Sequence, residues 1–123
     1  WIHAWGSSGY YASWLGQRRA READFFTAAD QRALFKQMVG AVLTRNNTLT
    51  GVRYGDDPAV LAWELGNELT DVSYGYYSDA PPPSEWSDAI GAFVKEHATQ
   101  LVMDGAQFSS ASLALSHVDL VGR

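Results

Sequence analysis

The sequence contains no cysteine, no long apolar run and no excess of positive charge. Without cysteine the chain forms no disulfide framework and no thiolate metal site. No apolar run approaches the roughly 18 residues that a membrane-spanning helix needs, and no secretory signal opens the chain, so we expect no membrane partner. The net charge of −5 argues against a nucleic-acid partner, because such proteins present a basic surface.

The composition is that of a folded domain rich in aromatic residues. Apolar residues make up 46% of the 123 residues and charged residues 19%, which is typical of one globular domain. Aromatic residues make up 13%, including five Trp and six Tyr. Core packing is the favoured explanation for any one of them, although Trp and Tyr also form the flat faces on which sugar rings stack.

Both ends of the sequence fall in or next to apolar runs. Trp1 begins the chain in place of a methionine, and Arg123 closely follows the run at residues 118–121. We therefore expect the chain to be a fragment of a longer protein.

Two segments have the apolar spacing of amphipathic helices. Residues 28–44 repeat apolar side chains at helical intervals, and Thr27 followed by Asp30 is a helix-start signature. Residues 6–27 are interpreted as a loop with at most a short helix at 11–15. Ser84 is expected to cap a second helix. The apolar face of this second helix is predicted to contain Trp86, Ile90, Phe93, Val94, His97 and Leu101.

Three short apolar segments, at residues 60–65, 101–103 and 118–121, are predicted as strands. The first is apolar on both faces, as in a parallel sheet covered by helices. Residues 112–116 are expected to form at most one helical turn. The order strand, helix, strand, helix, strand predicts an α/β fold with parallel strands.

Two carboxylates, Glu64 and Glu68, mark the end of the first strand segment. In a helix they would share a face about 6 Å apart along the axis, which would permit a paired-carboxylate or di-metal site. Pro58, Gly66 and Asn67 disfavour such a short helix, and the histidine that these metal sites use is absent. The strand interpretation is therefore favoured.

In a strand the same two carboxylates are separated by roughly 13 Å. This excludes them as a glycosidase pair, whose carboxyl groups lie about 5–5.5 Å or 6.5–9.5 Å apart. Glu64 would lie inside the strand, where it must be hydrogen-bonded or charge-paired. Glu68 would lie at the carboxyl end, where parallel α/β folds collect their chemistry. From composition alone, a surface loop glutamate is the better explanation of Glu68.

The stretch Ala-Trp-Glu-Leu-Gly-Asn-Glu at residues 62–68 resembles the fourth strand of glycoside hydrolase family 5, most closely its endo-β-1,4-mannanases. In that family the Asn-Glu pair ends the strand, and the glutamate is the general acid/base. Leu69 stands where the family usually has proline. The likeness extends to Trp5, Gly9, Tyr11, Trp14, Asp24–Thr27, Arg45-Asn46, Thr50-Gly51, Tyr54–Pro58 and Val118–Arg123.

The resemblance implies an α/β fold that is a fragment of a (β/α)8 TIM barrel, from about the end of strand three through strand six. Residues 1–123 would then be the central part of a single catalytic domain, because a full barrel needs about 250 residues. The family's nucleophile is a glutamate on strand seven, which this register places beyond Arg123. Asp104, in an expected strand-ending Asp-Gly turn, and Asp119 are interpreted as structural.

The implied function is retaining, endo-acting hydrolysis of β-1,4-mannan. Glu68 would be the catalytic acid/base and Asn67 would bind the sugar 2-hydroxyl. Trp5 and Tyr76, with Tyr74 and Tyr77, would offer stacking surfaces. Trp86 and His97 are expected in the core.

No cofactor and no metal ion are expected for this function. The partner would be a β-linked polysaccharide, and the full-length enzyme would be an extracellular monomer. Hydrolysis of another β-glycan such as cellulose is the alternative within the family. A non-catalytic carbohydrate-binding protein is the alternative outside it, although such modules are mostly β-sandwiches and two long helices argue against one.

Overall fold

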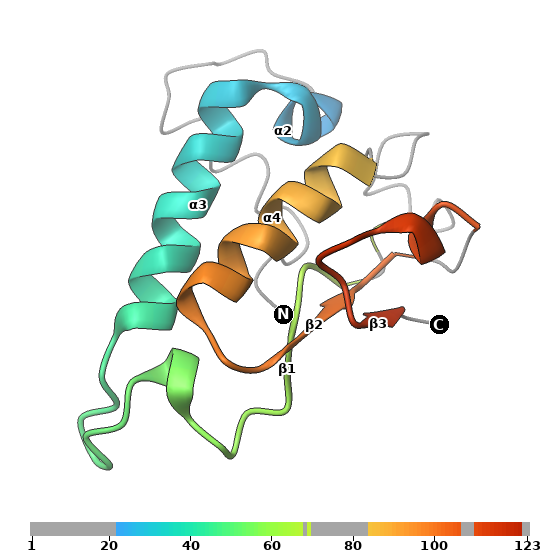
Figure 1. Ribbon diagram of the computed structural model, residues 1–123. Coiled ribbons are helices and arrows are strands. Elements are labelled where there is room, and N and C mark those ends of the chain that lie inside the picture. Colours follow the sequence, from blue (N-terminus) through green and yellow to red (C-terminus); the bar gives the residue numbers. More distant parts are fainter. Residues whose placement is uncertain (1–21, 68, 70–83, 107–109, 122–123) are drawn as a thin grey trace.

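A computed structural model describes residues 22–67, 69, 84–106 and 110–121. Its elements, in chain order, are α2 (Glu22–Thr27), α3 (Ala29–Thr44), the 3-10 turn η1 (Tyr54–Asp56), β1 (Ala62–Glu64), α4 (Ser84–His97), β2 (Leu101–Asp104), the 3-10 turn η3 (Ser112–Ala114) and β3 (Leu120–Val121) (Figure 1). Among these residues no helix has both the length and the apolar character needed to cross a bilayer.

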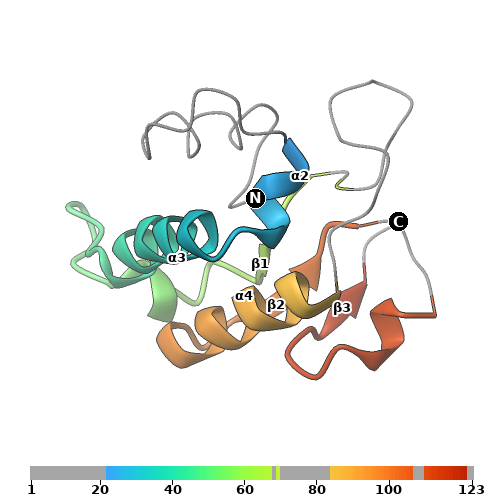
Figure 2. The ribbon, with the colours of Figure 1, turned by 90° about the horizontal axis from the view of Figure 1, so that it is seen from above.

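The three strands form one parallel sheet in the order β1-β2-β3. Glu64 at the end of β1 pairs with Met103, and Val121 at the end of β3 pairs with Asp104. Helix α4 lies between β1 and β2 in the sequence, packs against β2, and lies beside α3 (Figures 1 and 2). Parallel strands with intervening helices confirm the predicted α/β class.

Among the described residues, the hydrophobic core lies between α2, α3, α4 and the sheet. Trp86 of α4 is its centre and is fully buried, as predicted. The rings of Phe25, Phe26 and Phe35 surround Trp86, with centroids 5.7, 5.0 and 5.7 Å from its own. The other buried apolar residues are Val39, Leu43, Leu65, Leu69, Ile90, Val94 and Val102. Aromatic packing of this kind contributes stability beyond the area that it buries.

The start of α3 differs from the prediction. Residues 22–27 form helix α2 where a loop was expected, and Thr27 ends that helix. Ala28 occupies the N-cap of α3 in extended geometry, with no side-chain cap hydrogen bond. The Thr27 signature was therefore wrong as a helix start. Burial of Phe25 and Phe26 against the core accounts for the additional helix, since both are 5% exposed or less.

The strands also have different limits from those expected. Strand β1 covers only residues 62–64 of the predicted 60–65, and Leu61 before it is 74% exposed. Strand β3 covers residues 120–121 rather than 118–121. Leu101 begins β2 and does not belong to the face of α4, because that helix ends at His97. His97 itself is half-buried, and its Nδ1 lies 2.8 Å from the Phe93 carbonyl oxygen.

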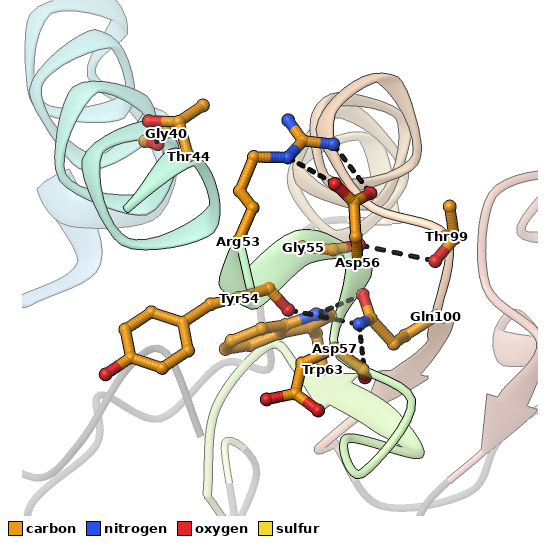
Figure 3. A network of polar contacts seen from close by, with 10 residues as sticks. All are labelled: Gly40, Thr44, Arg53, Tyr54, Gly55, Asp56, Asp57, Trp63, Thr99 and Gln100. Atoms are coloured by element: carbon orange, nitrogen blue, oxygen red, sulfur yellow. Dashed lines mark hydrogen bonds and ion pairs between the residues drawn. The ribbon is translucent and has the colours of Figure 1, made fainter. Parts of the chain in front are cut away.

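A polar network joins the segments that enter β1 and β2 (Figure 3). The side-chain amide of Gln100 donates to the carbonyl oxygens of Tyr54 and Asp57, at 3.1 and 3.0 Å. Its amide oxygen accepts from the indole N–H of Trp63, at 3.0 Å. One side chain therefore satisfies three partly buried polar groups from η1, its following loop and β1. In barrels this amino-terminal end of the strands serves stability rather than chemistry.

Gln100→Leu is expected to destabilise the complete domain by about 1–3 kcal/mol, because the two carbonyls and the indole N–H lose their partner. The kcat of the folded variant should not change. The midpoint of urea unfolding measures the first effect. Arg53→Met is the matched control from the same network, because it removes only an exposed ion pair to Asp56. Equal losses for both variants would contradict the role given to Gln100.

Candidate functional site

The carboxyl ends of β1 and β2 lie side by side and define the candidate site. The ladder continues one residue past β1, where the Leu65 N–H donates to the Met103 carbonyl at 2.9 Å. The chain then leaves the sheet through Gly66 and Asn67, and Asn67 is half-buried. The prediction of a strand at this position is confirmed. The helical di-metal interpretation is wrong, since Ala62–Glu64 is a strand.

Three of the four predicted site residues lie outside the described residues. Glu68 is the single position between Asn67 and Leu69 that the structure does not describe. Trp5 and Tyr76, with Tyr74 and Tyr77, also belong to the undescribed segments. Their roles therefore stay predictions.

Leu69 and Gly105 fix the far end of the turn that contains Asn67. The Leu69 N–H donates to the Gly105 carbonyl at 3.1 Å, and the Leu69 side chain is fully buried. Gly105 follows the last residue of β2 and is itself buried. Sequence reasoning assigned Gly105 only to a strand-ending turn. Its contact with the turn after β1 depends on two strands meeting in space.

Glu64 is the last residue of β1 and is half-buried. It takes part in a hydrogen bond or electrostatic interaction, as a carboxylate inside a sheet requires. One of its oxygens, Oε1, lies 3.0 Å from the point where a β-carbon on Gly105 would sit. Glu64 therefore belongs to the same strand end as Asn67.

Asp104 is a buried carboxylate at the end of β2, with 3% of its surface exposed. Its Oδ1 accepts the Ala106 N–H at 3.3 Å, which is the strand-ending turn that the sequence predicted. Burial raises the pKa of Asp104, while hydrogen bonds from the Ala106 N–H and the Ser87 hydroxyl oppose the rise. These contacts support the structural interpretation.

Asp119 connects α4 to the sheet. Its two oxygens lie 2.8 and 2.7 Å from the Lys95 ammonium, and Oδ2 also accepts the Val102 N–H at 2.8 Å. The hydrogen bond from Lys95, with the one from Val102, lowers the pKa of Asp119. Both oxygens of this carboxylate bind Lys95, and one also binds the Val102 N–H, which agrees with the structural interpretation.

A second carboxylate contact was not predicted from the sequence. Oδ1 of Asp88, in α4, accepts the backbone N–H of His117 at 3.0 Å. Oδ2 of the same carboxylate lies 3.0 Å from the ring Nδ1 of His117, which belongs to the segment before β3. No local signal identifies it, because the partners are separated by 29 positions along the chain. The contact ties the segment before β3 to α4.

Solved structures and curated proteins resemble the chain over different lengths. The endo-1,4-beta-mannanase from Rhizomucor miehei superposes with a TM-score of 0.78 at 27% identity, covering 98% of this chain and 41% of that one. The hyperthermostable endo-1,4-beta-D-mannanase from Thermotoga petrophila gives 0.72 at 22% identity, over 91% of this chain and 38% of that one. The fold is thus part of the (β/α)8 barrel of these structures.

Two curated relatives are mannan endo-1,4-beta-mannosidases. Mannan endo-1,4-beta-mannosidase 4 of Oryza sativa subsp. japonica is 47% identical over 66 residues, which are 51% of this chain and 14% of that protein. Mannan endo-1,4-beta-mannosidase 2 of Arabidopsis thaliana is 34% identical over 101 residues, which are 76% of this chain and 22% of that protein. The chain thus spans less than a quarter of either relative.

A family model described as GH family 5 beta-mannosidase-like matches residues 6–119, which is most of the sequence. The match includes strands β1 and β2 and the segment that carries Asn67 and Glu68, and it ends just before β3. The chain belongs to glycoside hydrolase family 5.

Proposed function

We propose that residues 1–123 are the central part of a single catalytic domain that hydrolyses β-1,4-mannan. The observation that supports this proposal is the position of Asn67, three residues beyond the last residue of the parallel strand β1. This is the end of the sheet where barrel enzymes hold their catalytic groups. The relatives named as mannan endo-1,4-beta-mannosidases support mannan as the substrate.

In this proposal the reaction is endo-acting and retains the anomeric configuration. Glu68 protonates the glycosidic oxygen while a glutamate outside residues 1–123 attacks the anomeric carbon. Glu68 then removes a proton from the water that hydrolyses the glycosyl-enzyme. The two steps need one carboxyl group that can both give and accept a proton, held beside the scissile bond.

The substrate proposal is tested by comparing kcat/KM of the complete barrel domain on β-1,4-mannan, cellulose and xylan. Mannan is expected to be hydrolysed fastest, with internal cleavage that lowers viscosity before much reducing sugar appears. Faster hydrolysis of cellulose would move the proposal to another β-glycan. The polymeric substrate also supports an extracellular location, since a polysaccharide must be cut before its sugars enter a cell. A monomer is proposed because one barrel can hold the complete catalytic site.

Asn67→Ala is expected to lower kcat/KM on mannan about 10- to 100-fold, chiefly through kcat. The physical reason is that a hydrogen bond from Asn67 to the sugar 2-hydroxyl strengthens in the transition state. Steady-state kinetics on mannan measures the effect. Asn46→Ala is the control, because Asn46 is an exposed asparagine near the opposite ends of the strands. A higher KM with an unchanged kcat would contradict the proposed contact.

A further inference from the structure

The turn from Gly66 to Leu69, called here the Asn67 turn, is attached at both ends to a single residue of the neighbouring strand. At its far end the Leu69 N–H donates to the Gly105 carbonyl at 3.1 Å. At its near end the carbonyl of Gly66 occupies the place where a β-carbon on Gly105 would stand. The backbone of Gly105 is therefore in contact with the first and last residues of the turn.

The contact at the near end is possible only because residue 105 is glycine. A β-carbon there would overlap the Gly66 oxygen, lie 2.6 Å from the Gly66 carbonyl carbon and approach the Glu64 carboxylate. Backbone atoms cannot turn away as a flexible side chain can. Any side chain at 105 must therefore push the start of the Asn67 turn away from β2.

The turn is also closed on itself. The Leu69 side chain folds back over Gly66, so that a β-carbon on Gly66 would overlap its Cδ2 and lie 2.9 Å from its Cγ. Leu69 is fully buried in the core. Gly66 is not among the described glycines with positive φ, so an alanine there meets steric contact but no backbone strain.

We propose that Gly105 is a positioning residue for the acid/base, acting through Gly66 and Leu69 to fix the Asn67 turn. The inference rests on the proposed function, in which the residue between Asn67 and Leu69 transfers the proton. The Leu69 N–H and its fully buried side chain fasten the far end of the turn to β2 and the core. A displacement of about 1 Å at such a group can cost about 10²-fold in rate.

Gly105→Ala in the complete domain is expected to lower kcat on mannan by about 10- to 100-fold with little change in KM. On an aryl β-mannobioside with a dinitrophenolate leaving group, release of the first product should fall by a smaller factor than the mannan rate, because that group departs without protonation. A merely structural role would not separate the two substrates.

Gly55→Ala is the matched control. A β-carbon on Gly55 would lie 2.5 Å from the His97 carbonyl oxygen, so the steric conflict is again with backbone. Gly55 is buried in η1, at the entry to β1 and away from Asn67. This variant should lose stability but, while folded, keep the mannan-to-aryl rate ratio of the parent.

Gly66→Ala combined with Leu69→Ala keeps the inference testable where Gly105→Ala fails to fold. Gly66→Ala alone should reduce the mannan rate, because its new methyl group meets the Leu69 side chain. Adding Leu69→Ala removes that side chain and leaves its N–H in place, so at least part of the rate should return. Non-additivity of this kind measures coupling between the two residues.

The outcomes separate the inference from the proposed function. In the first outcome, the parent is active and its activity depends on Glu68, but Gly105→Ala or Gly66→Ala slows both substrates equally. This result would overturn the positioning role alone. A double variant slower than the two single changes predict by addition also overturns it. A parent that does not hydrolyse mannan, with Glu68→Gln unchanged from it, overturns the proposed function together with the inference.

Discussion

Glu68→Gln is expected to reduce kcat on mannan by about 10²- to 10⁴-fold, the range that general acid–base catalysis contributes. Glutamine has nearly the shape of glutamic acid but can neither give a proton to the glycosidic oxygen nor take one from water. Because the two side chains are nearly equal in size, the substitution should leave the fold intact. Reducing sugar released from mannan by the complete domain measures the loss.

Glu64→Gln is the control for this prediction. Glu64 is four positions earlier and belongs to β1, so it tests whether loss of any carboxylate in this segment has the same effect. Because Glu64 takes part in an interaction of its own, Glu64→Gln is expected to lower the free energy of unfolding. Its effect on kcat should be much smaller than that of Glu68→Gln. Near-normal activity of Glu68→Gln on mannan would remove Glu68 from the mechanism.

Residues 1–123 expressed alone are expected to release no reducing sugar from mannan. The proposed nucleophile belongs to another strand of the barrel, so the first chemical step has no attacking group. The described sheet also has β1 and β3 at its edges, and apolar side chains on the strands or beside them are exposed: Leu61 is 74%, Leu101 39% and Leu120 36% exposed. A sheet with such edges favours association over a preorganised site.

The same chain carrying Glu68→Gln is the control for that assay. Activity in the 123-residue chain that this change abolishes would mean that a nucleophile lies within it. Asp104 and Asp119 would then be the candidates. Their present contacts argue against both, since Asp104 is buried beside Ser87 and Asp119 binds Lys95.

The helices with a clear apolar period were predictable from the sequence. Residues 28–44 and the start at Ser84 agree with α3 and α4, because one buried stripe on each helix sets the spacing. Helix α2 was missed since its six residues are too few for a period to show. It is stabilised by Phe25 and Phe26 packing on Trp86, which is distant in the sequence.

The candidate site was predictable only in part. An apolar run ending in a polar pair correctly placed Asn67 after a parallel strand. The role of Gly105 could not be read in the same way, because a glycine after a strand is ordinarily explained by a turn. Its significance arises when β1 and β2 pair and the Gly66 carbonyl fills the space of a missing side chain. The Gln100 network has the same origin in tertiary contacts.

In the proposed mechanism, Glu68 acts as the acid in the first step and as the base in the second. Pre-steady-state kinetics of Glu68→Gln on the dinitrophenyl β-mannobioside tests this double role most directly. The leaving group needs no proton, so the glycosyl-enzyme should form at nearly the parent rate. Its hydrolysis needs the missing base. We therefore expect a burst of about one equivalent of dinitrophenolate per active site, followed by slow turnover. A variant with no burst and no first-step activity, or one that turns over as fast as the parent, would contradict it.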